Sequence, residues 1–124
     1  MQKNNKPRIG RVIPFERDGA FFLRRGSERL DRNDLIEAIS YYHQAYRRDP
    51  ENVEIQLAIA EVLTEMHRYE ESNSLLFPLL SREESPAECF FGIACNFLGL
   101  QEFSHAHDSL ESYLALDPDG DYVA

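Results

Sequence analysis

A period of 34 residues runs through this chain and constrains its fold more than any other sequence feature. When the sequence is aligned with itself at this offset, residues of similar type (large, small or turn-forming) occupy equivalent positions in three consecutive units. The aligned positions are Phe22, Gly26, Ala38, Tyr42, Ala45 and Pro50; then Gln56, Ala60, Ser72, Leu76, Leu79 and Glu84; then Phe90, Ala94, Ala106, Leu110, Tyr113 and Pro118. A fixed period of this size means that one supersecondary unit is stacked on copies of itself.

Each unit predicts two helices joined by a turn, because apolar residues recur at spacings of three and four. The expected helices span residues 20–30, 35–48, 53–66, 69–81, 87–98 and 102–116. We expect Asn33 to take a left-handed backbone conformation, which asparagine tolerates better than most residues. Asp34 and Glu37 have the spacing of a capping box, Pro78 should kink or shorten its helix, and Gly99 should mark a helix end. These signals predict three helical hairpins.

Small residues at the aligned positions explain how the two helices of a hairpin could pack. We expect Gly26 to face Ala38, Ala60 to face Ser72, and Ala94 to face Ala106. Small side chains on both sides let two helix axes approach to the short end of the usual 8–10 Å. The pattern therefore assigns most apolar residues to packing.

The chain resembles tetratricopeptide-repeat proteins, and the best match is the segment 33–52, which reads like the second helix and closing turn of one unit. The resemblance covers residues 19–120. It implies an all-α fold, a right-handed superhelix of three antiparallel helix-turn-helix repeats, or α-solenoid. The sequence departs from the family pattern at Arg25, Arg29, Gln56 and Glu84. The two arginines suggest a first unit with a polar outer face.

This organisation divides the chain into a basic arm and a repeat domain. Residues 1–18 carry a net charge of +3 and no helical period, so we expect an extended or flexible arm. Residues 19–124 form the domain, with units at 19–52, 53–86 and 87–120. The arm has three interpretations: a disordered terminus, a segment that crosses onto an acidic groove of its own or a neighbouring chain, or a binding site for an unrelated partner.

The resemblance also implies a concave groove lined by the first helix of each unit. The predicted peptide-binding residues are Leu23, Ser27, Leu30, Glu54, Leu57, Glu61, Glu65, Glu88, Phe91, Cys95 and Leu98, with Ala20, Asp31, Thr64 and Gly99 at adjoining positions. Well-known family members place basic and amide residues there to hold a terminal carboxylate, whereas this groove would be acidic and apolar. It should favour a basic or amphipathic segment with apolar anchors. The alternatives are that the glutamates are merely solvated and that Phe91 and Leu98 only pack.

Other kinds of chemistry find little support in the sequence. Segment 104–109 contains the letters of a hydrolase triad, but neighbours on a helix point in different directions and no nucleophile elbow accompanies them. His105 and His107 lack the i, i+4 spacing of helical zinc ligands. Cys95 could be a reactive groove thiol, although a lone helical cysteine is more often a small buried hydrophobe. We expect no enzyme activity, no metal and no cofactor.

Charge and cysteine spacing limit the partners and the compartment. The net charge of −9 argues against nucleic acid and anionic membranes as partners. The longest apolar runs are far shorter than a membrane span. Cys89 and Cys95 lie six apart on one predicted helix and point to different sides, so we expect reduced thiols and a cytoplasmic protein.

The predicted function is a non-enzymatic scaffold that binds a protein or peptide partner in the groove. The alternative is a chaperone-like protein that sequesters a client, as secretion chaperones of similar size and charge do. The last predicted helix presents Leu110, Tyr113, Leu114 and Leu116 on one face. A second copy of the chain could cover this face and form a homodimer, or the array could continue into a longer protein.

Overall fold

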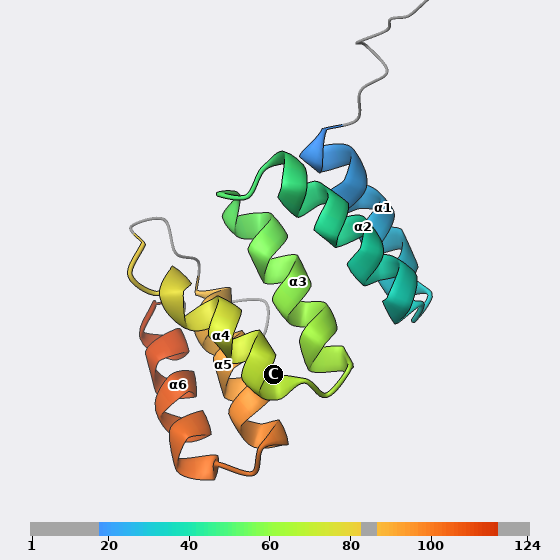
Figure 1. Cartoon of the computed structure of the whole chain (residues 1–124). Helices are drawn as coiled ribbons and strands as arrows, with labels where there is room; N and C mark the ends of the chain where they lie inside the picture. Colours follow the sequence, from blue (N-terminus) through green and yellow to red (C-terminus); the bar gives the residue numbers. More distant parts are fainter. Residues whose placement is uncertain (1–17, 83–86, 117–124) are drawn as a thin grey trace, which may run out of the picture.

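The described part of the protein, residues 18–82 and 87–116 of a computed structural model, consists of six α-helices. They are α1 (Gly19–Asp31), α2 (Leu35–Arg48), α3 (Val53–Glu65), α4 (Tyr69–Leu79), α5 (Glu88–Gly99) and α6 (Phe103–Leu116). Consecutive helices pair as three hairpins, and the hairpins stack along the chain (Figure 1). The predicted all-α solenoid of helical hairpins is therefore confirmed. The predicted arm before Asp18 and the turn at 117–120 lie outside the described residues.

Polar side chains fix where several helices begin. The Asp18 carboxylate accepts from the backbone N–H of Phe21 at 3.0 Å, and Asn52 accepts from that of Glu54 at 2.8 Å. These contacts satisfy N–H groups that have no partner inside a helix. Asp34 accepts from the N–H of Glu37 at 3.4 Å, but the Glu37 carboxylate pairs with Arg29 at 3.5 Å. The reciprocal bond of a capping box is therefore replaced by a link between α1 and α2.

The turns inside the three hairpins have one geometry. Their left-handed residues, Asn33, His67 and Gln101, have φ angles of 59°, 61° and 64° and lie 34 residues apart. In each turn the next residue donates its N–H to a carbonyl five residues earlier, and all three bonds are 2.8 Å long. This is the Schellman arrangement, in which a left-handed residue lets the chain leave the helix while its last carbonyls stay bonded.

One expectation about helix ends is confirmed and another needs correction. Gly99 is the last residue of α5, as predicted, although the left-handed position of the turn belongs to Gln101. A Cβ on Gly99 would lie 2.3 Å from Cζ of Tyr69, so this glycine gives room to a ring of α4. Helix α4 ends at Leu79, two residues before the predicted end, with Pro78 in its last turn. Proline can occupy that position although its ring and missing N–H oppose continuation.

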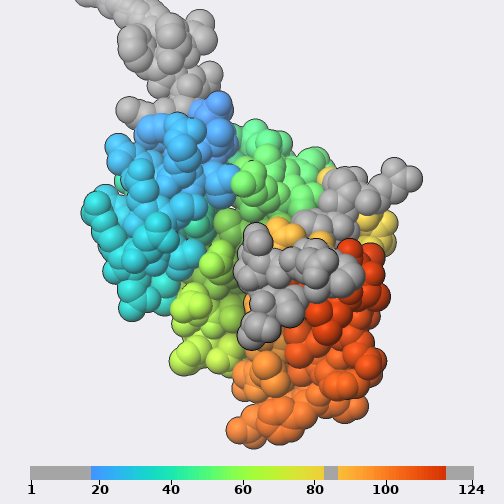
Figure 2. Space-filling model, turned by 180° about the vertical axis from the view of Figure 1, so that it is seen from behind, coloured from blue at the N-terminus to red at the C-terminus, as the bar shows by residue number. Residues whose placement is uncertain are grey.

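The core is divided between two clusters that meet at α3. One cluster joins α1 and α2 to Ile55, Ile59, Val62 and Leu63 of α3. The other joins Ala60 of α3 to buried residues of α4 and α5, including Leu76, Cys89 and Ile93. Figure 2 shows the same order from the opposite side, with the blue-to-cyan first hairpin and the orange-to-red third hairpin on either side of green α3. Helix α3 therefore connects the first hairpin to the third.

The predicted small positions are all buried, and one of them, Gly26, leaves room for an aromatic ring. A Cβ on Gly26 would lie 2.3 Å from Cε1 of Tyr42, so this position faces a ring of α2. Ala38, Ala60, Ser72, Ala94 and Ala106 are each at most 2% exposed. Ser72 donates to the carbonyl of Ala60 at 2.9 Å, which brings α3 and α4 into close contact.

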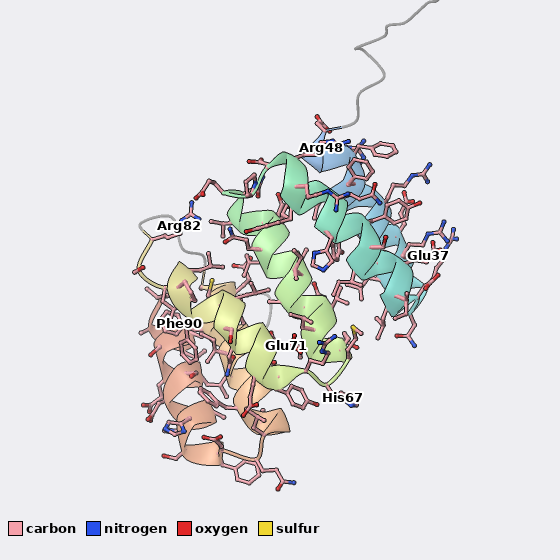
Figure 3. The ribbon with its side chains drawn as sticks, viewed as in Figure 1. Glu37, Arg48, His67, Glu71, Arg82 and Phe90 are labelled. Carbon is pink, nitrogen blue, oxygen red and sulfur yellow. The ribbon has the colours of Figure 1, made fainter. Side chains whose placement is uncertain are left out.

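Arginines cover the outside of the first hairpin. Arg25 pairs with Glu28 at 3.4 Å, and its guanidinium lies 5.5 Å from the ring centroid of Phe21. Figure 3 shows Arg48 at the end of α2, beside the start of α1, where its guanidinium lies 5.2 Å from the ring centroid of Phe22. Such contacts combine cation–π attraction with burial of the aliphatic stem. The departures from the family pattern at Arg25 and Arg29 are thus accommodated by surface contacts.

Candidate functional site

A hollow of about 530 Å³ lies across the first helices of the three hairpins. Its lining includes the half-buried apolar side chains of Leu23 of α1, Leu57 of α3 and Phe91 of α5, which we call the apolar floor. The complete lining consists of Leu23, Ser27, Leu30, Asp31, Tyr42, Glu54, Leu57, Ala58, Ala60, Glu61, Thr64, Glu65, Ser72, Leu76, Glu88, Phe91, Gly92 and Cys95. Because three separate helices form the wall, the hollow depends on the stacking of the hairpins.

The predicted groove residues lie together in this hollow, with one exception. Leu98 does not line it and has a side chain 47% exposed at the end of α5. The hollow ends before this last turn, where the ring of Tyr69 packs against Gly99. Ala20 and Gly99, which the resemblance also suggested, are likewise absent from the lining.

Several lining residues were not predicted, because they come from the second helices or from hairpin-packing positions. Tyr42 belongs to α2, and Ser72 and Leu76 belong to α4. Tyr42 and Ser27 are within hydrogen-bond distance at 3.2 Å between their hydroxyl oxygens. Burial raises the pKa of the Tyr42 phenol more than the Ser27 hydrogen bond lowers it, and the Glu61 and Asp31 charges add smaller increases, so this hydroxyl stays protonated. The periodicity identified Tyr42 only as a packing residue.

Five exposed carboxylates line the hollow together with the apolar floor, and their surroundings differ from those of three carboxylates elsewhere on the surface. Glu28, Glu37 and Glu71 each form an ion pair with an arginine. Within residues 18–82 and 87–116, no such pair is formed by the lining carboxylates Asp31, Glu54, Glu61, Glu65 and Glu88. The hollow therefore concentrates negative charge that the described residues leave uncompensated.

The charge is strongest where α1 and α3 end. Asp31 is the last residue of α1, Glu65 is the last of α3, and Glu61 lies one turn earlier. The C-terminus of a helix carries partial negative charge, so carboxylates there add to it. Desolvation at the wall of the hollow raises the pKa of Glu61, and the charges of Glu65 and Asp31 raise it further. A cation placed here would relieve this repulsion.

A buried polar cluster lies beneath one part of the lining and joins three helices. Asn96 of α5 donates to Ser72 Oγ and to Asn73 Oδ1, both at 2.8 Å, and accepts from Thr64 Oγ1 at 2.6 Å. The hydroxyls of Thr64 and Ser72 are 2.9 Å apart. Since Asn96 and Ser72 are completely buried, these bonds satisfy groups that water does not reach. The cluster connects the second and third hairpins.

Two lining residues of α5, Phe91 and Cys95, have further properties that bear on the hollow. The Phe91 ring lies 5.7 Å from that of Tyr113 of α6, so it contributes both to the hollow and to packing. Cys95 is half-buried and forms no disulfide, and desolvation raises the pKa of its thiol. A raised thiol pKa lowers the fraction of nucleophilic thiolate. Cys95 is thus a slow nucleophile at neutral pH.

The polar segment at 104–109 lies on exposed α6, away from the hollow. His105 Nδ1 is 3.0 Å from Glu102 Oε1, a contact between the first turn of α6 and the residue that precedes this helix. His107, Asp108 and Glu111 bring potential ligand atoms within 4.8 Å of one another, and all three are exposed. Neighbouring charged side chains on a helix commonly lie this close.

Among the described residues, no helix is both long and apolar enough to cross a membrane.

Comparisons with known proteins agree with this architecture. The tetratricopeptide-repeat family model matches residues 29–88. The chain is 29% identical over 113 residues to "TPR repeat-containing protein YvcD" of Bacillus subtilis (strain 168). That alignment covers 90% of this chain but 23% of the relative, so the chain spans under a quarter of the relative's length.

Solved structures with the same fold are more distant in sequence. The first TPR domain of human RPAP3, determined by NMR, has a TM-score of 0.75 at 17% identity, covering 83% of this chain and 81% of that one. The first TPR of Spaghetti (RPAP3), bound to the HSP90 peptide SRMEEVD, gives the same TM-score and identity, covering 83% and 82%. MamA (41-end) from Desulfovibrio magneticus RS-1 has a TM-score of 0.72 at 14% identity, covering 83% and 58%. Family model, fold and sequence period agree, and they confirm the predicted resemblance of this chain to tetratricopeptide-repeat proteins.

Proposed function

We propose that this protein is a non-enzymatic scaffold whose hollow binds a basic or amphipathic segment of a partner protein. Tetratricopeptide repeats commonly mediate protein–protein interactions, and their binding surface is often concave. The observation that carries the proposal is the set of five lining carboxylates around an apolar floor, without an ion pair among the described residues. Charge complementarity selects cationic side chains, and the floor accepts apolar ones.

The charge of the hollow also indicates which ligands it would reject. The peptide bound to the RPAP3 domain, SRMEEVD, has three acidic residues and one arginine. The hollow of this chain would place such carboxylates near Asp31, Glu61 and Glu65, and like charges that meet at an interface cost binding free energy. We therefore expect this protein to discriminate against peptides of that kind.

A direct binding measurement tests the proposal. Fluorescence anisotropy would compare a labelled peptide that alternates arginine with leucine and a matched peptide that alternates glutamate with leucine. We expect only the basic peptide to bind, and E61Q/E65Q to weaken it by about tenfold, from two exposed charge contacts of roughly 0.2–1 kcal/mol each. E51Q/E70Q removes the same charge at exposed sites outside the hollow and should leave the affinity unchanged.

The alternative outcomes separate other interpretations. Equal binding of the two peptides, or equal losses in both double variants, would refute recognition by the hollow. The chaperone-like alternative predicts that a single aggregation-prone client stays soluble only when the protein is present. A scaffold instead predicts several soluble partners whose binding E61Q/E65Q weakens. Co-purification with the wild-type and variant proteins distinguishes these two cases.

A further inference from the structure

We infer that residues 1–17 of this chain are themselves a ligand of the hollow, so that the protein carries its own competitor for the partner. The inference rests on the proposed function, because it uses the same hollow and the same preference for basic segments. It goes beyond that function because it names an occupant of the hollow. It also implies that a partner must displace the arm in order to bind. Three observations support it: the charge of the two elements, the order of residues in the arm, and the distance to be spanned.

The charges of the arm and the hollow are complementary. Residues 1–17 contain Lys3, Lys6, Arg8, Arg11 and Arg17 and a single acidic residue, Glu16. The hollow has five lining carboxylates that form no ion pair within the described residues. Opposite charges attract over about 8 Å at physiological ionic strength, and further in a cleft that concentrates the field. The arm therefore meets the requirement inferred for a partner.

The order of residues in the arm also suits the lining. Segment 8–15 reads Arg-Ile-Gly-Arg-Val-Ile-Pro-Phe, in which cationic residues interrupt apolar ones. The hollow offers matching chemistry, since half-buried leucine and phenylalanine side chains and exposed carboxylates line it together. Proline restricts the backbone of a free segment, which lowers the entropy lost when that segment binds.

The attachment point places the arm within easy reach. Asp18 caps the start of α1, and Leu23, the first lining residue of α1, follows five residues later. At 1.5 Å per residue, these positions are about 8 Å apart along the helix axis. Seventeen extended residues can span up to roughly 56–61 Å. A short tether also raises the effective concentration to the millimolar range, so weak contacts suffice to keep the hollow occupied.

Cys95 offers a direct measure of occupancy in the full-length protein. Its thiol lies in the lining, whereas Cys89 is completely buried and reports global opening. Alkylation with iodoacetamide, followed by mass spectrometry of each cysteine, would be carried out at one alkaline pH that ensures enough thiolate. An arm that fills the hollow for about nine-tenths of the time would slow Cys95 labelling about tenfold, because only the open fraction reacts.

Two arm variants with the same charge change separate docking from general electrostatics. R8Q/R11Q removes cations inside the apolar segment and should raise the Cys95 rate severalfold. K3Q/K6Q removes two cations outside it and should have a smaller effect. V12S/I13S tests the apolar contribution without any change in charge and should also raise the rate. An unchanged Cys89 rate in every variant verifies that the fold is intact.

Adding a synthetic peptide of residues 6–17 distinguishes this inference from the proposed function. If the peptide slows Cys95 labelling in R8Q/R11Q, and the arm variants react faster than the wild type, both are supported. If the peptide protects Cys95 but no arm variant changes the rate, the hollow binds basic segments and the inference about the arm is overturned. If the peptide does not protect Cys95 and no arm variant changes the rate, both the proposed function and the inference about the arm are refuted. Protection that increases with protein concentration would overturn docking within the same chain, because it would indicate the arm of a second copy.

Discussion

At the scale of single residues, the charged Glu61 carboxylate is expected to favour binding of basic peptides but to oppose folding. Desolvation raises its pKa above the ordinary value of 4.5, and the neighbouring Glu65 and Asp31 charges raise it further. The folded protein therefore binds this proton more tightly than the unfolded chain does. Stability contributed by Glu61 falls as the pH rises from the ordinary value through the raised one, so the charged form opposes folding at neutral pH.

We predict that E61Q stabilises the protein at pH 7 while it weakens binding of basic peptides. After allowance for solvent screening at this exposed residue, the gain in the free energy of unfolding should be small, about 0.5 kcal/mol. It should vanish well below pH 4.5, where Glu61 is protonated in both states. Urea denaturation at several pH values measures this, with E70Q as the charge-matched control. A stability loss at pH 7 would contradict the prediction.

A second residue-scale prediction concerns the contact of Gly26 with the ring of Tyr42. In G26A the new methyl would lie 2.3 Å from Cε1 of a ring that is 1% exposed and enclosed by the core. The overlap should outweigh the helix propensity of alanine and cost about 1–3 kcal/mol in the free energy of unfolding. Chemical denaturation provides the measurement.

The matched control for this substitution is G92A. There the nearest atom to the new methyl is Cδ1 of Leu76 at 3.0 Å, the flexible end of a side chain. The methyl has room after a small shift, and alanine favours the helix, so we expect a change within about 0.5 kcal/mol. Similar losses in G26A and G92A would argue that Tyr42 is not what makes glycine necessary.

At the scale of elements, the polar cluster around Asn96 connects α3, α4 and α5. In N96L three hydrogen bonds disappear, and Thr64, Ser72 and Asn73 lose buried partners. An unsatisfied buried group costs about 1–3 kcal/mol, so we predict a loss of roughly 2–4 kcal/mol. Thermal unfolding followed by circular dichroism checks this. S74A, which removes an exposed hydroxyl bonded only within α4, should be almost neutral.

The turns show which features of an element a sequence can reveal. Asn33 was expected to be left-handed because asparagine tolerates positive φ, whereas nothing in the chemistry of His67 or Gln101 indicates the same geometry. The 34-residue offset from Asn33 would have identified both. The repeated Schellman bonds, rather than side-chain preference, impose the conformation there.

This imposed geometry gives an element-scale prediction. Q101G should stabilise the protein by about 1 kcal/mol, because glycine adopts positive φ without the strain of a Cβ. H67G should gain less, since it loses a ring that stacks on Tyr69 at 5.7 Å. Differential scanning calorimetry of the two variants gives the order. A destabilised Q101G would indicate that its side chain contributes more than its backbone strain costs.

At the scale of the whole molecule, the period determined the stacking order, and the stacking order determined which residues share the hollow. That is why most lining residues could be predicted from one helix of each unit. Tyr42, Ser72 and Leu76 could not, because the same small and large positions serve both packing and the hollow. The Asn96 cluster was also invisible, since its polar side chains are not repeated at the 34-residue offset, where Ser72 aligns with alanines and Asn96 with Val62. Contacts between units depend on orientations that no single unit specifies.

Two exposed leucines of α6 yield a prediction about assembly. Leu114 and Leu116 are 43% and 61% exposed, whereas Tyr113, which was predicted on the same bare face, is buried. Apolar groups at such a face favour association, so we predict a concentration-dependent homodimer of this chain through α6. Light scattering across micromolar concentrations would detect it, and L114E/L116E should give the monomer without loss of helicity. A wild-type chain that stays monomeric throughout would contradict this.

The separation of paired and unpaired carboxylates has a consequence for the kinetics of encounter. Glu28, Glu37 and Glu71 lie beside arginines and produce little field at a distance, whereas the carboxylates of the hollow act together. A basic partner would be rotated and drawn toward this face before any contact forms. Long-range steering of this kind raises the association rate and leaves the dissociation rate largely unaltered. Added salt should accordingly slow the arrival of a partner more than it hastens its departure.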